Sequence, residues 1–175
     1  MPRQRASRTS AQALRVTRLK AADRDFWDEQ CEKLRHLLAD RPKGRAPGVP
    51  PSDTRSGRLR WFVYSFVRRL KQRNRLGIIT GVVYGLDFEP TKISFKANPY
   101  YWALYAFENV EKLSISAKDM SRFSLQMLYA ERHNIDPELL VGFIYQQGND
   151  NDLAYKVASG YIEPLLAPYL MRQSS

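Results

Sequence analysis

The chain has 175 residues, of which 43% are apolar and 26% are charged, a balance typical of a folded globular domain. Its 28 lysines and arginines against 18 acidic residues give a formal net charge of +10 at pH 7. A single cysteine excludes an internal disulfide and a cysteine metal cluster. The sequence has neither the apolar core of a signal peptide nor an apolar run of ~18 residues, so we expect a cytoplasmic protein with no membrane span.

Residues 1–20 are predicted to form a basic arm. They open a half-chain, residues 1–76, that holds 20 Lys/Arg against 7 acidic residues, a net of +13, whereas residues 77–175 hold 8 against 11, a net of −3. We expect the arm to be partly disordered, because it has few apolar side chains to bury. The uneven charge favours contact of the amino-terminal half with nucleic acid or an anionic membrane.

Residues 21–39 are predicted to form a helix and residues 40–56 a Pro/Gly-rich linker, ahead of a helical domain over residues 57–175. Acidic residues crowd the start of the helix, as its dipole favours. Apolar residues recur on one stripe of it: Trp27, Cys31, Leu34 and Leu38. Because Cys31 lies on that stripe, we interpret it as a structural thiol.

Residues 57–76, GRLRWFVYSFVRRLKQRNRL, predict a second helix with two unlike faces. At about 100° per residue, the apolar side chains fall within one arc: Leu59, Phe62, Val63, Phe66, Val67 and Leu70. The opposite arc interleaves positive charges with aromatic rings: Arg60, Trp61, Tyr64, Arg68, Lys71 and Arg75. Gly77 is expected to end the helix.

Residues 78–97 are predicted to form a small β-hairpin. The stretches GIITGVVYGLDF and TKISFK are rich in β-branched residues, hydrophobic residues alternate in both, and Glu89-Pro90 supplies a turn. Glycines recur at every fourth position from Gly77 to Gly85, which also suits a closely packed helix. The β-branched content favours strands.

From residue 98 onward the sequence predicts a compact set of short helices. Asn98 followed by Pro99 is a helix start, and Ser116 with Asp119 forms a capping-box pattern before a helix that ends near His133. A later Asp-Pro pair and the stretch NDND open two more helices. The predicted fold class is therefore mainly α (α+β), a multi-helix domain with a small β-hairpin, preceded by a basic, partly disordered arm.

Residues 128–144, LYAERHNIDPELLVGFI, resemble a helix-turn-helix over about 20 residues. Asn134 suits the left-handed turn between the two helices. The second helix, however, offers no Arg or Lys, and base readout usually depends on Arg, Lys, Asn or Gln near the start of that helix. We therefore interpret the segment as a structural corner between helices.

The second helix supplies the residues predicted to contact nucleic acid: Arg58, Arg60, Trp61, Tyr64, Arg68, Arg69, Lys71 and Arg75. The basic side chains suit phosphates, and the interleaved rings suit stacking on unpaired bases. One alternative is a solvated face whose charges complement the helix dipole. Another is an amphipathic helix on an anionic membrane, which is weaker because Leu59, Phe62 and Phe66 are needed to hold the helix against the domain.

The aromatic-rich segment NPYYWALYAF is interpreted mainly as core, because its rings are spread around a whole helix. A ring left at the surface is a candidate for contact with another protein or a second copy of the chain. The candidates are Tyr100, Tyr101, Trp102 and, further along, Tyr145.

Catalytic patterns in the sequence are weak. The two histidines, His36 and His133, lie on different predicted helices, and His133 is expected to be a surface or capping residue. Asp87, Glu89 and Lys92 resemble a nuclease carboxylate–lysine cluster, but their spacing is wrong for a strand-borne pair. We therefore predict no catalytic residue, no metal and no cofactor.

The predicted function is that of a non-catalytic DNA- or RNA-binding accessory or regulatory subunit. Its basic half would contact the phosphate backbone with weak sequence preference, and its carboxyl-terminal half would contact another protein or a second copy. About five phosphate contacts on duplex DNA give a slope of log affinity against log salt of roughly −4 to −5. The alternatives are a structural subunit of a larger nucleoprotein or transfer complex, a protein-interaction inhibitor or adaptor that does not bind nucleic acid, and a metal-dependent nuclease built on Asp87 and Glu89.

Overall fold

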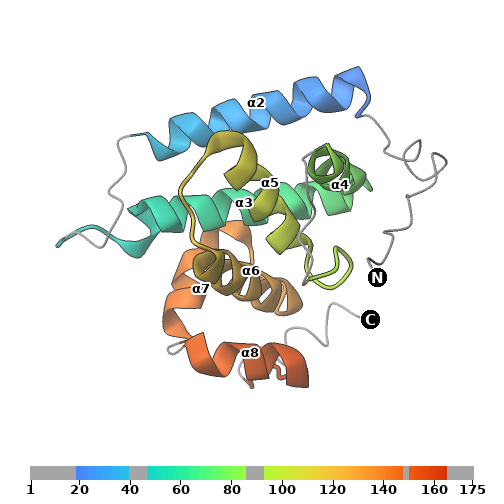
Figure 1. Ribbon diagram of the computed structural model, residues 1–175. Helices are drawn as coiled ribbons and strands as arrows, with labels where there is room; N and C mark the ends of the chain where they lie inside the picture. The colour runs from blue at the N-terminus through green and yellow to red at the C-terminus, as the bar shows by residue number, and fades with distance from the viewer. Residues whose placement is uncertain (1–18, 40–46, 86–92, 148–149, 165–175) are drawn as a thin grey trace, which may run out of the picture.

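The computed structural model describes residues 19–39, 47–85, 93–147 and 150–164 (Figure 1). Within these ranges the chain is helical and contains no strand. In chain order the helices are α2 (Ala21–Leu38), the 3-10 turn η1 (Pro51–Asp53), α3 (Arg55–Gln72), α4 (Gly77–Tyr84), α5 (Pro99–Glu111), α6 (Ala117–Arg132), the 3-10 turn η2 (Pro137–Leu139), α7 (Leu140–Gln146) and α8 (Asp150–Ser159).

Side-chain caps begin three of the helices. The Asn98 side chain accepts a hydrogen bond from Tyr101 N at 3.2 Å, and the Ser116 hydroxyl accepts one from Asp119 N at 3.0 Å. Both caps were predicted from the sequence, and each satisfies an amide that the first turn of a helix leaves without a partner. Thr54 caps α3 in the same way.

The core is built around α3, which contacts α2, α5, α6 and α7. Aromatic rings from three helices meet in its centre. Trp27 of α2 stacks on Phe107 of α5 with ring centroids 4.4 Å apart, and Phe66 of α3 meets the edge of Phe107 at 5.3 Å. Stacked and edge-to-face pairs of this kind add to the gain from burying apolar area. Cys31 is buried in the same core, as its place on the apolar stripe predicted.

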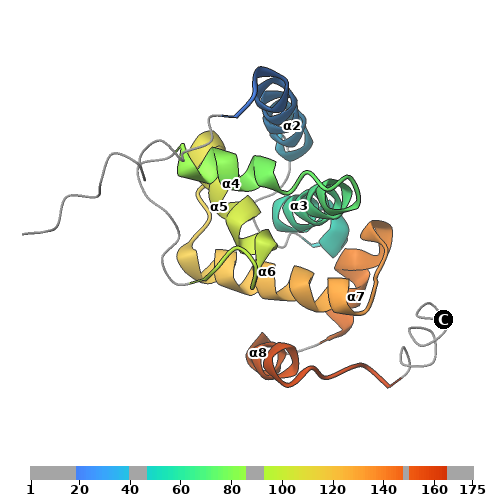
Figure 2. The ribbon, with the colours of Figure 1, turned by 90° about the vertical axis from the view of Figure 1, so that its right-hand side faces the viewer.

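Helices α2 and α3 run in opposite directions, so that the start of α2 and the end of α3 lie at the same end of the molecule (Figure 1). A contact at each end fixes this arrangement. Arg75, just beyond α3, contacts the Asp23 carboxylate at 2.6 Å, and Arg55 Nη1 donates to the carbonyl of Leu38 at 3.3 Å. Figure 2 shows α4 and α5 on the side of α3 that α7 does not cover.

The predicted β-hairpin over residues 78–97 is wrong, because the first part of it is helix α4. Four apolar side chains of α4 lie on one face and are buried: Ile78, Ile79, Val82 and Val83. Residues 93–98 form turns, and 86–92 lie outside the described residues. Burying one continuous face outweighs the modest strand preference of β-branched residues, so the fold class of the described chain is all-helical rather than α+β.

The end of the second predicted helix also differs from the prediction. Helix α3 ends at Gln72, and the chain reverses at Asn74, whose φ of 53° is left-handed. Gly77 therefore opens α4 instead of ending α3. The end of the predicted linker is ordered, since η1 packs against α3 and α7, whereas residues 1–18 and 40–46 lie outside the described part of the chain.

Candidate nucleic-acid interface

Tyr64 lies in the core and not on the predicted basic face. Its exposed fraction is 0%, its ring stacks on that of Tyr100 with centroids 5.6 Å apart, and its hydroxyl donates to the carbonyl of Ile135 at 2.7 Å. Burial raises the pKa of Tyr64 to about 12. The prediction that this ring stacks on a base is therefore wrong, because Tyr100 of α5 and Ile135, which follows α6, cover it.

Arg60 and Arg68 use their guanidinium groups to join α3 to the helices beside it. Arg60 Nη1 donates to Gln126 of α6 at 2.8 Å. Arg68 donates to the carbonyl of Ile135 at 2.5 Å and to the side chain of Asn134 at 2.8 Å. These acceptors are neutral, and the guanidinium donors that would bind a phosphate already have partners.

Lys71 and Arg75 form ion pairs with acidic residues that are distant in sequence. Lys71 Nζ lies 2.8 Å from the Glu131 carboxylate of α6, and Arg75 contacts Asp23 of α2. The Arg75 guanidinium also lies over the ring of Phe26, 4.9 Å from its centroid. Four of the predicted phosphate ligands, counting Arg60 and Arg68, thus make contacts that hold the helices together.

Arg58 and Trp61 lie near the amino-terminal end of α3. Arg58 pairs with Asp53 of η1, and Trp61 is half-buried against the core. Trp61 therefore presents part of its ring at the surface next to an arginine whose charge is already compensated. The predicted alternation of open charges and open rings along α3 does not extend over this end of the helix.

Arg69 and Arg73 differ from the other basic residues of this segment. No side-chain hydrogen bond or ion pair is found for either of them within the described ranges. Arg69 is in the last turn of α3 and Arg73 follows it, at the end of the molecule where Lys20 precedes α2. We call Lys20, Arg69 and Arg73 the basic end. Residues 1–18, which join it in sequence, contain five arginines and no acidic residue.

The predicted protein-contact residues divide into buried and exposed ones. Tyr100 and Trp102 are buried, and Trp102 Nε1 donates to the carbonyl of Ile93 at 2.9 Å, so neither ring is available to a partner. Tyr101 is half-buried against the core. Tyr145 on α7 is 58% exposed and remains a candidate.

Sequence reasoning missed a groove beside α7. Its volume is about 600 Å³, and its apolar lining comes from Ile135, Leu139, Phe143 and Pro164. Leu139 is 62% exposed. The signal in the sequence was the adjacent pair Leu139-Leu140, since neighbouring residues of a helix point about 100° apart and only one of the two can face the core.

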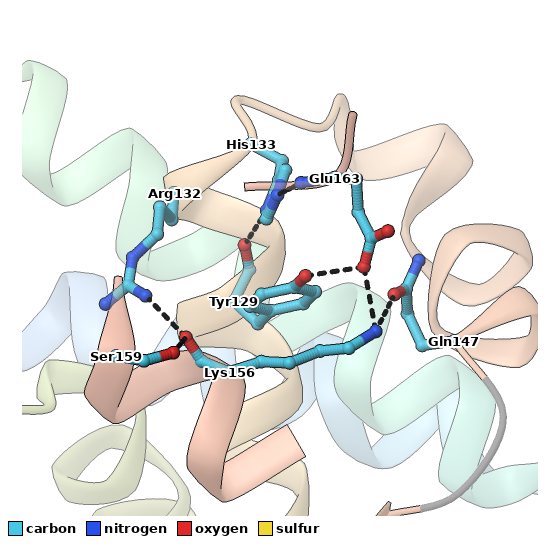
Figure 3. A network of polar contacts seen from close by, with 7 residues as sticks. All are labelled: Tyr129, Arg132, His133, Gln147, Lys156, Ser159 and Glu163. Carbon is cyan, nitrogen blue, oxygen red and sulfur yellow. Dashed lines mark hydrogen bonds and ion pairs between the residues drawn. The ribbon is translucent and has the colours of Figure 1, made fainter. Parts of the chain in front are cut away.

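His133 was expected to be a surface or capping residue: it is the C-cap of α6, as expected, but it is buried, with an exposed fraction of 1%, and does not lie at the surface. It belongs to a polar network with Tyr129, Lys156 and Glu163 (Figure 3). The carboxylate–lysine cluster at 87–92 lies outside the described residues. Among the residues that are described, no group of three or more acidic, histidine or cysteine side chains is placed to hold a metal ion.

The chain matches no known protein family, and comparison with curated proteins and with solved structures also gives no match. Within the described part of the chain, no helix is long and apolar enough to span a membrane. The arguments that follow therefore depend on the geometry of this chain.

Proposed function

We propose that the protein is a non-catalytic nucleic-acid-binding accessory or regulatory subunit of the cytoplasm, which contacts the phosphate backbone through its basic end and residues 1–20. The observation that carries the proposal is the pair Arg69 and Arg73, whose side chains have no partner within the described residues. We therefore assign the proposed contact to the end of α3 and not to Arg60, Arg68, Lys71 and Arg75.

The chemistry of the basic end suits phosphates. Side chains four residues apart are neighbours on a helix surface, so Arg69 and Arg73 can reach the same stretch of backbone. Planar guanidinium groups bind phosphate oxygens in pairs. Contacts of this kind fix position without reading sequence, so we expect similar affinities for unrelated sequences of equal length.

A salt-titrated binding assay with duplex and single-stranded probes tests the proposal. Each phosphate contact contributes about 0.9 to the slope of log affinity against log salt on duplex DNA, so the double variant Arg69→Gln, Arg73→Gln should reduce the magnitude of the slope by about 2. The matched control is Lys112→Gln, Lys118→Gln, which removes the same charge from exposed positions flanking the α5–α6 connection. The control should leave the slope nearly unchanged.

Two results would contradict the proposal. One is a binding affinity that does not change with salt, since phosphate contacts always release counterions. The other is an equal loss of slope in both double variants, which would mean that total charge matters and the basic end does not.

A second function is favoured by the groove beside α7, which exposed Leu139 lines, and by the exposed ring of Tyr145 on the same helix. In that case the chain is an adaptor or a structural subunit of a nucleoprotein complex, and its contacts are with protein. An isolated chain with no measurable affinity for DNA or RNA at low salt, and with self-association that Leu139→Glu abolishes in sedimentation, would support this function over the first.

A further inference from the structure

The segment that follows α8 returns to the end of α6 and is held there by His133 (Figure 3). The imidazole makes one hydrogen bond on each nitrogen. Nδ1 lies 2.8 Å from the carbonyl oxygen of Tyr129, and Nε2 accepts from the backbone amide of Glu163 at 2.9 Å. An amide N–H only donates, so Nε2 carries no proton, and Nδ1 carries the proton that it donates to Tyr129. His133 is thus held as one neutral tautomer.

The Glu163 side chain reinforces the same attachment. Its Oε1 accepts from the Tyr129 hydroxyl at 2.6 Å and from Lys156 Nζ at 2.9 Å. Burial by itself would raise the pKa of the Glu163 carboxyl, but these two donors outweigh it and hold that pKa below the usual range. Glu163 therefore stays ionised between pH 7 and pH 5.

The charged and titratable groups around His133 come from two helices and the segment itself. Helix α7 contributes the uncharged ring of Phe143, with its centroid 5.5 Å from that of the imidazole. Arg132 Nη1 donates to the carbonyl of Lys156 at 3.1 Å and so joins α8 to α6 without reaching the imidazole. Among the described residues, these groups are Tyr129, Arg132, Lys156, Tyr161 and Glu163.

We propose that His133 is a pH-sensitive latch, whose protonation releases residues 161–164 from α6. An imidazolium carries N–H groups on both nitrogens, so Nε2–H would face the N–H of Glu163 and the hydrogen bond between them is lost. The Glu163 carboxylate attracts the new charge, but swinging it towards Nε2 breaks its bonds to Tyr129 and Lys156. In both cases, hydrogen bonds that hold residues 161–164 in place are lost.

Release of this segment also changes the groove beside α7. Glu163 and Pro164 form one wall of the groove, which Leu139 and Phe143 also line. When that wall detaches, the apolar surface of Phe143 becomes open to solvent. Protonation of an imidazole increases as the pH falls. The apolar surface offered beside α7 therefore increases as the pH falls.

Hydrogen exchange of the Glu163 amide, followed by NMR on the full chain between pH 7.5 and 5.0, tests the latch. After correction for the intrinsic exchange rate, protection of this amide should fall by up to about tenfold per pH unit as the pH is lowered, because opening is coupled to the uptake of one proton. The amide of Val67, in the core of α3, should keep its protection over the whole range.

Two variants test whether His133 causes the pH dependence of the protection of the Glu163 amide. His133→Gln can place an amide oxygen where Nε2 lies, so it accepts from Glu163 without titrating and should lose the pH dependence. His36→Gln removes the only other histidine of the chain, whose side chain is 77% exposed on α2 beside Glu32, and should keep the pH dependence.

The latch is overturned by protection of Glu163 that is independent of pH, by loss of protection at Val67 in parallel, or by equal pH dependence in His133→Gln. A further test uses the unmodified chain, so it does not depend on whether a variant folds. The nitrogen chemical shifts of His133 at pH 7.5 should report a proton on Nδ1, and a proton on Nε2 at that pH would also overturn the proposal.

Discussion

Arg68 and Arg69 are adjacent in sequence but differ in what they contact, so we expect opposite effects from the same substitution. Arg68 donates to Ile135 and Asn134, which follow α6, whereas Arg69 has no side-chain partner within the described ranges. Arg→Met keeps most of the apolar stem and removes every donor. Arg68→Met should therefore destabilise the fold, and Arg69→Met should leave the fold intact and weaken binding to nucleic acid.

The magnitude for Arg68 follows from its two shorter hydrogen bonds, to Ile135 and Asn134, since the third, to the Tyr64 hydroxyl, is long at 3.4 Å. Bonds to a charged donor contribute about 1.5–3 kcal/mol each when buried. The Arg68 side chain is only half-buried, so water replaces part of what is lost and we expect about 2 kcal/mol in total. For a chain of this length that lowers the melting temperature by roughly 4–8 °C. Arg69→Met should change the free energy of unfolding by less than about 0.5 kcal/mol.

Urea unfolding followed by far-ultraviolet circular dichroism measures both free energies, and the salt-titrated assay measures both affinities. The reasoning fails if the two variants are destabilised equally. It also fails if Arg68→Met is as stable as the unmodified chain but binds nucleic acid more weakly, since Arg68 would then be a phosphate ligand and the contacts with Ile135 and Asn134 would contribute nothing.

Two further predictions concern packing and pH. A Cβ on Gly57 would lie 2.0 Å from the carbonyl oxygen of Pro51, so Gly57→Ala should destabilise the fold by about 3 kcal/mol, whereas Gly142→Ala, with nothing within 4 Å, should stabilise it by up to about 1 kcal/mol in the same urea assay. Because burial raises the pKa of Tyr64 to about 12, and an unfolded tyrosine ionises near 10, the stability from its neutral phenol is complete below about pH 10 and is lost as the pH rises towards 12. Spectrophotometric titration should show Tyr64 ionising together with alkaline unfolding, and ionisation at pH 10 in the folded chain would contradict the burial argument.

The helices could be predicted where a local signal fixes them. The caps at Asn98 and Ser116 and the left-handed turn at Asn134 depend on a few neighbouring residues, and all three are confirmed. Helix α4 could not be identified in the same way. Its isoleucines and valines carry a local preference for strands, and the contacts with α5 that reverse it are not visible in the sequence.

The candidate interface was harder to predict, because a helical wheel shows which side chains share a face but not what covers it. Tyr64 shares a face with Arg60 and Lys71, yet it is buried. The partner of Lys71 is Glu131, 60 positions away, and only the folded chain brings the two together. The sequence therefore predicts the positive charge of α3 correctly. Whether a ligand can reach that charge depends on contacts between helices.

Helix α2 separates the points at which two basic stretches of the sequence are attached to it. Residues 1–20 join one end of α2, and Arg41, Lys43 and Arg45 follow its other end. The 18 residues of α2 set these two points about 27 Å apart. Exposed Asp25 and Asp28 lie between them. The two basic stretches of the sequence are therefore attached to α2 at points this far apart, which suits contacts with different segments of a bound polymer.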